Sequence, residues 1–299
     1  MNRFQILNNS PQYRMQYVGE QNIVDVSSIK QLNSRFRSGS FSVKYVMTGT
    51  EHYTVSGKHY PVGAGRYLLT NACSAGEIVI DSQQPVQGLC IEVAPGLVSE
   101  VLAVNQDYSN PYPDTDFHNF LTGAGFFESD YAVGTTNLGR FIQSAIPLFH
   151  CAGPADDLLL SQFFYGVAEN MLCDQKEVFK YLGAFDNVKY STRKDLLGRL
   201  LKGKEYMDDN YCEQLTITAI AQQATMSEYY FLRLFKQVFR CPPHKYLVHR
   251  RLSRASVLLQ QDQFSVAEVA YKCGFSDIHS FSKAFKKHMG HNPSEEKGK

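Results

Sequence analysis

The chain has 299 residues, a net charge of +1 and 43% hydrophobic residues, a composition typical of a soluble globular protein of about two domains. No apolar run approaches the roughly 20 residues that a membrane-spanning helix needs, and the N-terminus lacks the apolar stretch of a secretion signal. The seven cysteines are odd in number and include no C-x-x-C pair, which argues against a disulfide framework and a zinc finger. We therefore expect a cytoplasmic protein with reduced thiols and no membrane contact.

The charge is distributed unevenly along the chain. Residues 1–190 carry 12 Lys and Arg against 18 Asp and Glu, a net charge of −6. Residues 191–299 carry 18 against 11, a net charge of +7. This asymmetry favours a C-terminal part that faces a polyanion and an acidic N-terminal part with a different task.

The first half of the chain predicts a β-rich domain. From residue 40, apolar and polar residues alternate in the pattern of a half-buried strand. The apolar residues of this pattern are Phe41, Val43, Tyr45 and Met47, and the polar residues are Ser40, Ser42 and Lys44. Further short apolar segments, separated by Gly and Pro, follow as far as Pro95. Several short strands at such spacing are typical of an antiparallel sandwich or barrel.

A helical segment is predicted after a break at Gly153–Pro154. Residues 155–185 predict two helices, and the first carries an apolar stripe. The stripe consists of Leu159, Phe163, Gly166, Val167 and Met171. Residues 186–195 are the predicted linker, with Ser191 or Thr192 as the cap of the next helix.

The last third of the chain contains one pattern twice. Residues 216–227 match residues 265–276 at an offset of 49, and the segments that follow match at an offset of 50. Each copy predicts a short helix, a tight turn and a longer basic helix, which is a helix-turn-helix unit. Thr216 is the expected cap of the first copy, and Ser265 with Glu268 forms a capping box in the second. The apolar stripes of the longer helices are Phe231, Leu234, Phe235 and Val238, and Phe281, Ala284, Phe285 and His288.

Residues 242–261 predict a helix that joins the two copies. It begins with two prolines and carries an apolar stripe of Val248, Leu252, Ala255 and Leu259. A helix of about 17 residues is roughly 25 Å long, so it can hold two reading helices about one DNA turn apart. The three arginines on this helix are open to phosphate contact or to surface salt bridges; they are Arg250, Arg251 and Arg254.

Residues 193–297 resemble the DNA-binding domain of the AraC/XylS family of bacterial transcription regulators. The family signature is matched by "VAEVAYKCGFSDIHSFSKAFKKHMGHNP", with Cys273 where the family usually has Val or Leu. The first copy fits as well, in "RLFKQVFRCPPHKYLVHRRLSRASVLL".

The resemblance implies that the longer helix of each unit enters the major groove of DNA. The expected contacts are Glu228, Tyr229, Leu232, Arg233 and Lys236 in the first unit, and Asp277, Ile278, His279, Ser282, Lys283, Lys286 and Lys287 in the second. Arg233 is the expected base reader, because a guanidinium can bind guanine O6 and N7 together, and Lys283 stands in the equivalent turn. Lys236, Lys286 and Lys287 suit phosphates. Leu232 and Ile278 either contact thymine methyl groups or cover the core.

For the N-terminal half, the resemblance implies a cupin-like barrel that binds a small-molecule effector, although pattern and not motif supports it here. Metal-dependent cupins use a His-x-His, a Glu and a distant His, whereas this region offers only His52 and His59. We therefore expect no metal and no other cofactor. Apolar and tyrosine side chains can line a pocket or fill a core equally well, so the effector-binding residues are not identified.

Together these features predict an α+β protein with an N-terminal antiparallel β-barrel and an all-α C-terminal double helix-turn-helix domain. The expected domains are a sensing domain at 1–152, a helical dimerisation segment and linker at 153–190, and a DNA-binding domain at 191–299. Family members often dimerise through helices in this place, and the alternative is that these helices only pack on the barrel.

The expected function is that of a sequence-specific transcription regulator, not an enzyme. It would bind double-stranded promoter DNA as a homodimer, respond to an effector, and contact RNA polymerase if it is an activator, the family's commoner role. One alternative is a constitutive regulator whose barrel only dimerises. Another is a metal-dependent cupin enzyme with a DNA-binding tail.

Overall fold

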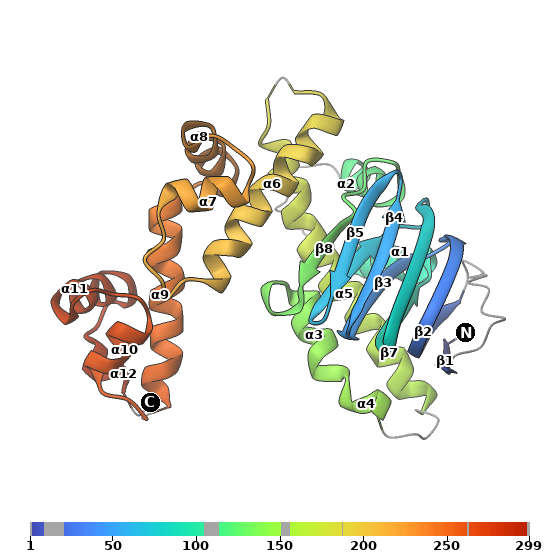
Figure 1. Cartoon of the computed structure of the whole chain (residues 1–299), viewed down its shortest axis with the longest axis horizontal. Helices are drawn as coiled ribbons and strands as arrows, with labels where there is room; N and C mark the ends of the chain where they lie inside the picture. The colour runs from blue at the N-terminus through green and yellow to red at the C-terminus, as the bar shows by residue number, and fades with distance from the viewer. Residues whose placement is uncertain are drawn as a thin grey trace. The chain divides into compact units, whose positions relative to one another are not determined.

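A computed structural model describes residues 2–8, 21–104, 114–150, 156–186, 188–261 and 263–297, and Figure 1 shows the course of the chain. The chain divides into two compact units, Met1–Lys180 and Tyr181–Lys299. Unit 1 combines a sheet with helices and unit 2 is helical, so the predicted α+β class is confirmed. The division at 1–152, 153–190 and 191–299 stays a prediction, and the break at Gly153–Pro154 lies outside the described residues. None of the described helices is long and apolar enough to cross a membrane.

The strands of unit 1 form one eight-stranded sheet within the described residues. They are β1 (Asn2–Asn8), β2 (Asn22–Arg37), β3 (Phe41–Thr48), β4 (Thr50–Val55), β5 (Lys58–Gly63), β6 (Arg66–Thr70), β7 (Ala75–Val93) and β8 (Ser129–Ala132). The order is β1-β2-β7-β3-β6-β8, and β4 pairs with β7 and β5. β1 runs parallel to β2, and the other pairs are antiparallel. The sheet is open between β1 and β8, so the predicted cupin-like barrel is not confirmed.

The strand predicted from residue 40 is present as β3, but it is buried on both faces and not on one. Ser40, Ser42 and Lys44 were expected to face solvent. They are instead at most 1% exposed, because they form hydrogen bonds in a polar cluster around Glu92 of β7. Ser40 and Ser42 donate to the Glu92 carboxylate, and Lys44 donates to Ser42. On the opposite face of β3, the ring of Phe41 packs against that of Phe126, with centroids 6.0 Å apart.

The helices of unit 1 follow β7 in the chain. They are α1 (Pro95–Val104), α2 (Asp114–Thr122), a 3-10 turn (Val133–Thr135), α3 (Asn137–Ala145), α4 (Pro147–His150) and α5 (Asp157–Gly183), and β8 lies between α2 and α3. The prediction of two helices at 155–185 is wrong, since α5 continues through Gly166 without a break. The ring of Phe141 from α3 lies so close to Gly166 that a Cβ there would meet it at 2.4 Å. Gly166 on its own would weaken the helix, but the packing of Phe141 against it stabilises α5 at this position.

The predicted stripe of α5 is buried at Phe163, Val167 and Met171, whereas Leu159 is 37% exposed and its neighbour Leu158 is 64% exposed. The first turn of α5 is therefore less covered within the described residues than the pattern predicts.

Unit 2 consists of helices joined by short turns. They are α6 (Tyr190–Asp209), α7 (Ile217–Gln223), α8 (Glu228–Phe239), α9 (Pro243–Gln260), α10 (Val266–Lys272), α11 (Ile278–Met289) and α12 (Pro293–Glu296). α6 begins at Tyr190 with Lys189 in the cap position, so the predicted caps Ser191 and Thr192 lie inside the helix. α9 has 18 residues and contacts both α8 and α11, as predicted for the joining helix.

Candidate nucleic-acid interface

The two helix-turn-helix units of unit 2 are α7 with α8 and α10 with α11, as the repeat predicts. Thr216 caps α7 by accepting a hydrogen bond from the Ala219 amide at 3.2 Å. Ser265 and Glu268 form the predicted capping box of α10. Local sequence fixes these helix starts because each cap satisfies amides that have no partner within the helix.

The turns of the two units have the same hydrogen bonds. In the first unit, the Thr225 amide donates to Gln222 O and the Met226 amide donates to Ala221 O. In the second, Gly274 donates to Tyr271 O and Phe275 donates to Ala270 O. The combination of a hydrogen bond over five residues and one over three residues is the Schellman motif, which commonly ends a helix. It sets the angle between the two helices of each unit.

The inner faces of the two longer helices are seated in aromatic cores. Phe231, Leu234, Phe235 and Val238 of α8 are at most 4% exposed, and Phe281 and Phe285 of α11 are fully buried. A Cβ at Gly203 of α6 would meet the ring of Phe231 at 2.6 Å, so that glycine permits the close approach of α6 and α8. The stripes predicted for these helices are confirmed, with one exception.

The exception is His288, which the pattern placed on the buried stripe of α11. His288 is exposed, and its ring stacks on that of His249 of α9 with centroids 4.6 Å apart. The pKa of His249 is lowered by burial and by the charges of His288 and Lys245. The core contact at the end of α11 is made by Phe285 and by Met289, the residue after His288, so the buried face passes beside His288 and not through it.

The outer face of α8 carries all the residues predicted to contact DNA in the first unit. Glu228, Tyr229, Leu232, Arg233 and Lys236 are each exposed. The guanidinium of Arg233 lies over the ring of Tyr230, 5.3 Å from its centroid. The Glu228 carboxylate accepts a 2.5 Å hydrogen bond from Thr218 of α7, so this carboxylate is held at the surface by its own unit.

In the second unit, His279, Lys283, Lys286 and Lys287 are exposed on α11, while Asp277, Ile278 and Ser282 are partly buried. Asp277 is the N-cap of α11, and its carboxylate accepts a 2.7 Å hydrogen bond from the Ser280 amide. These hydrogen bonds lower the pKa of Asp277. The structure thus gives Asp277 a structural role, and its predicted contact with DNA stays a prediction, as do those of the other residues.

The three arginines of α9 differ in their surroundings. Arg251 is 9% exposed and donates to the carbonyls of Tyr211 and Glu213, both at 2.7 Å, so it stabilises the fold and does not present its charge to a partner. Arg250 pairs with Asp208 at 3.3 Å. Arg254 is exposed.

Sequence reasoning did not identify the role of Asp208. Its side chain is 6% exposed and accepts from the hydroxyl of Tyr246 at 2.7 Å and from Lys204 at 3.0 Å, in addition to the pairing with Arg250. Burial, and then the charge of Asp208, raise the pKa of Tyr246. A carboxylate in the last turn of a helix opposes the helix dipole, which is the signal that could have indicated a paired, structural Asp.

Residues 220–298 match a family described as a helix-turn-helix domain. The uncharacterized HTH-type transcriptional regulator YijO of Escherichia coli K12 is 36% identical over 92 residues, which are 31% of this chain and 32% of that protein. The HTH-type transcriptional activator RhaS of Escherichia coli O139:H28 is 33% identical over 88 residues, 29% of this chain and 32% of that protein. The match therefore spans about a third of the length of these relatives.

Among solved structures, a transcriptional regulator with an AraC-type DNA-binding domain from Chromobacterium violaceum is 36% identical. The similarity covers 33% of this chain and 88% of that one, with a TM-score of 0.32.

The fold and the family match define the C-terminal part of the chain as a helix-turn-helix domain. Over this domain the chain is similar to transcription regulators, in agreement with the predicted resemblance to the AraC/XylS family.

Proposed function

We propose that the chain is a sequence-specific transcription regulator that binds double-stranded DNA through α8 and α11. The observation that carries this proposal is the equivalence of the two units. Each seats an aromatic inner face in its own core, each turns basic side chains outward, and α9 contacts both reading helices. At about 1.5 Å per residue, the 18 residues of α9 give a spacer of about 27 Å, which suits successive major grooves on one face of the duplex.

Within this proposal, Arg233 reads a base, and Lys236, Lys286 and Lys287 bind phosphates. The activator RhaS is a relative, which supports activation over repression and hence a contact with RNA polymerase. Unit 1 would sense a small molecule and form a homodimer through the region of α5, whose first turn exposes Leu158 and Leu159. Effector binding shifts the protein only if the effector prefers one arrangement of the two units.

The experiment is a selection of DNA duplexes from a random library by the purified full chain, followed by sequencing. We expect an enriched site with two half-sites about one helical turn apart. Arg233→Ala should cost roughly 1 to 3 kcal/mol on that site and relax the preference at one base pair. Lys180→Ala, on α5 and paired with Glu177, is the control and should leave the selected sequence unchanged. Selection of no sequence by the wild-type protein would contradict the proposal.

The enzyme alternative requires a metal site in the sheet. The rings of His52 and His59 stack with centroids 5.5 Å apart, on the paired strands β4 and β5. Within the described residues, no group of three or more His, Cys, Asp or Glu side chains could hold a metal ion. We propose on this basis that the sheet is not a metal-dependent cupin site, and metal analysis of the purified protein tests it, since stoichiometric iron or zinc would contradict it.

A further inference from the structure

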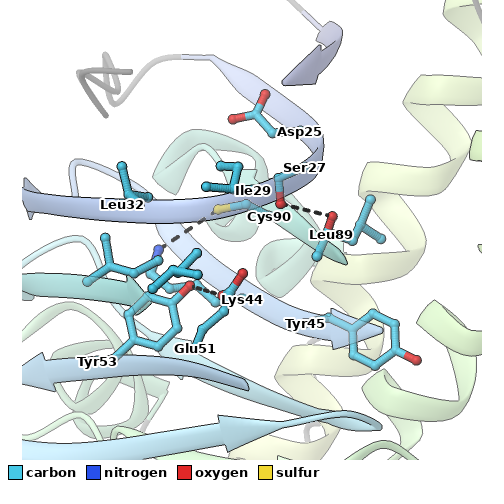
Figure 2. Close-up of a pocket in the computed structure, with 13 residues that line it drawn as sticks. Asp25, Ser27, Ile29, Leu32, Lys44, Tyr45, Glu51, Tyr53, Leu89 and Cys90 are labelled. Carbon is cyan, nitrogen blue, oxygen red and sulfur yellow. Dashed lines mark hydrogen bonds between the residues drawn. The ribbon is translucent and has the colours of Figure 1, made fainter. Parts of the chain in front are cut away.

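The cavity inside the sheet of unit 1, shown in Figure 2 beside Lys44, Glu51 and Tyr53, has a volume of about 20 Å³. This is room for about one water molecule, so the cavity does not hold an organic molecule in this conformation. A feature of unit 2 can instead distinguish one partner from another, because the two reading helices, α8 and α11, begin with different side chains.

The first residue of each reading helix occupies the same place in its unit. Glu228 follows Ser227, the N-cap of α8, and Ile278 follows Asp277, the N-cap of α11. In a helix that enters the major groove, the N-terminal residues contact the base edges. The first unit therefore presents a carboxylate at this place, and the second presents an aliphatic side chain.

Thr218 of α7 restrains the Glu228 carboxylate. The Thr218 hydroxyl donates a 2.5 Å hydrogen bond to Oε1 of Glu228. Both side chains are exposed, so this hydrogen bond, and not burial, holds the carboxylate in place. Among the described residues, Oε2 of Glu228 accepts no hydrogen bond, so this oxygen can accept one from a partner of the helix.

The second unit has no counterpart of this hydrogen bond. Thr218 is the second residue of α7, and the second residue of α10 is Ala267, which has no hydroxyl group. Ile278, at the place of Glu228, has no side-chain acceptor. Both members of the pair are therefore polar in the first unit and apolar in the second, although the caps and turns of the two units are alike.

The chemistry of the two side chains favours different bases. A carboxylate only accepts hydrogen bonds, and in the major groove cytosine presents the N4 amino group as a donor, whereas guanine presents the acceptors O6 and N7. Adenine places the acceptor N7 beside its N6 donor, and thymine presents an acceptor and a methyl group. A carboxylate at the base edges therefore favours cytosine, and an aliphatic side chain cannot replace it in this contact.

We propose that Glu228 reads the N4 amino group of a cytosine in the half-site of the first unit, with Thr218 as the positioning residue that orients its carboxylate. The second unit, with Ala267 and Ile278, does not read cytosine at the equivalent place. The two half-sites therefore differ, and the double helix-turn-helix domain binds its site in one orientation. This inference rests on the DNA binding proposed above.

The test uses the purified full chain and the duplex that it selects from the random library. Each base pair of both half-sites is replaced in turn, and binding is measured by fluorescence anisotropy. We expect one C·G pair, in one half-site, whose replacement weakens wild-type binding about tenfold. Glu228→Gln should prefer adenine there, because an amide both donates and accepts and so pairs with N6 and N7 of adenine. Asp209→Asn removes an exposed carboxylate at the end of α6, and as the matched control it should keep the preference for cytosine.

Thr218 is tested by two variants on the same duplexes. Thr218→Val removes the hydroxyl group at nearly constant shape and should reduce the preference for cytosine by about threefold or more. Thr218→Ser keeps the hydroxyl group and should restore the preference. If Thr218 only stabilised the contact between α7 and α8, Thr218→Val would lower the melting temperature and leave the base preference unchanged.

Two results would overturn the proposal. One is a Glu228→Gln variant whose base preference equals that of the wild type at every position, or whose affinity changes alike for all sequences. The other is a wild-type preference for cytosine at the equivalent place of both half-sites. Selection of a DNA site that Glu228→Gln reads as the wild type does refutes the role of Glu228 alone, whereas selection of no sequence by the wild type refutes DNA binding itself.

Discussion

Thr225 and Gly274 occupy the same left-handed backbone position in the two helix-turn-helix units, with φ of +53° and +80°. Each donates its amide to the carbonyl three residues earlier at 2.9 Å. A β-branched residue is strained in this region, whereas glycine is not. In the second unit, Gly274 adopts the left-handed conformation without strain. In the first unit, Thr225 adopts it at a cost in conformational energy.

We therefore expect Thr225→Gly to stabilise unit 2 by about 1 kcal/mol, because it removes the backbone strain and the Thr225 side chain makes no hydrogen bond to the described residues. Gly274→Thr should destabilise unit 2 by more than that, since a Cβ at this position would also meet the Cys212 carbonyl oxygen at 2.6 Å. Urea unfolding followed by far-UV circular dichroism measures both. Destabilisation by Thr225→Gly would show that the threonine side chain contributes more than its strain costs.

The second prediction concerns Arg251, whose hydrogen bonds to backbone carbonyls indicate a role in stability and not in DNA binding. Arg251→Ala should destabilise unit 2 by about 2 to 3 kcal/mol, since it leaves the carbonyls of Tyr211 and Glu213 without their donors. Arg254→Ala, on the exposed side of the same helix, should leave the unfolding midpoint nearly unchanged. If the two variants unfold alike, the buried hydrogen bonds of Arg251 are not important for stability.

The double helix-turn-helix was predictable because its signals are local. Caps such as Ser265, the glycine of the turn and the 3.6-residue period each act within a few residues, and a second copy supports each assignment. Features that depend on distant residues were not predictable. The burial of Lys44 depends on Glu92, a strand away, and the continuity of α5 through Gly166 depends on Phe141. The exposed His288 shows the same limit, since the helix period does not decide whether His288 or its neighbour Met289 packs against the core.

Lys44 and Glu92 form a buried pair whose side chains are each 1% exposed. Lys44→Met should destabilise unit 1 by about 3 to 5 kcal/mol, because Glu92 would be left as a buried charge without its cation. The double variant Lys44→Met, Glu92→Gln should recover part of this loss, as neither charge is then buried alone. Thermal unfolding of the wild type, the single variants Lys44→Met and Glu92→Gln, and the double variant measures the coupling. Simple additivity of the two single variants would contradict an interaction between these side chains.

Asp277 gives a prediction about pH, since its pKa in the folded protein is lowered by hydrogen bonds from Ser280. A depressed pKa stabilises the fold above the unfolded value, about 3.9, and this contribution is lost as pH falls through the folded pKa. Asp277→Asn keeps a capping oxygen but has no charge to titrate. The stability difference between wild type and Asp277→Asn should be constant from pH 7 to about pH 5 and disappear on further acidification. An unchanged difference at low pH would show that the cap does not depend on ionisation.

The salt dependence of DNA binding tests whether α11 contacts the phosphate backbone as proposed. If about six phosphates are neutralised, the affinity should fall with salt at a log-log slope near −5. Lys286→Ala should reduce the magnitude of this slope by about one and weaken binding to all sequences alike, because a lysine on a phosphate adds affinity without reading a base. Fluorescence anisotropy on the selected duplex over a range of salt concentrations measures the slope, and Lys180→Ala is again the control. A slope that Lys286→Ala leaves unchanged would mean that this side of α11 faces away from the duplex, and that the groove is entered by a different surface of the unit.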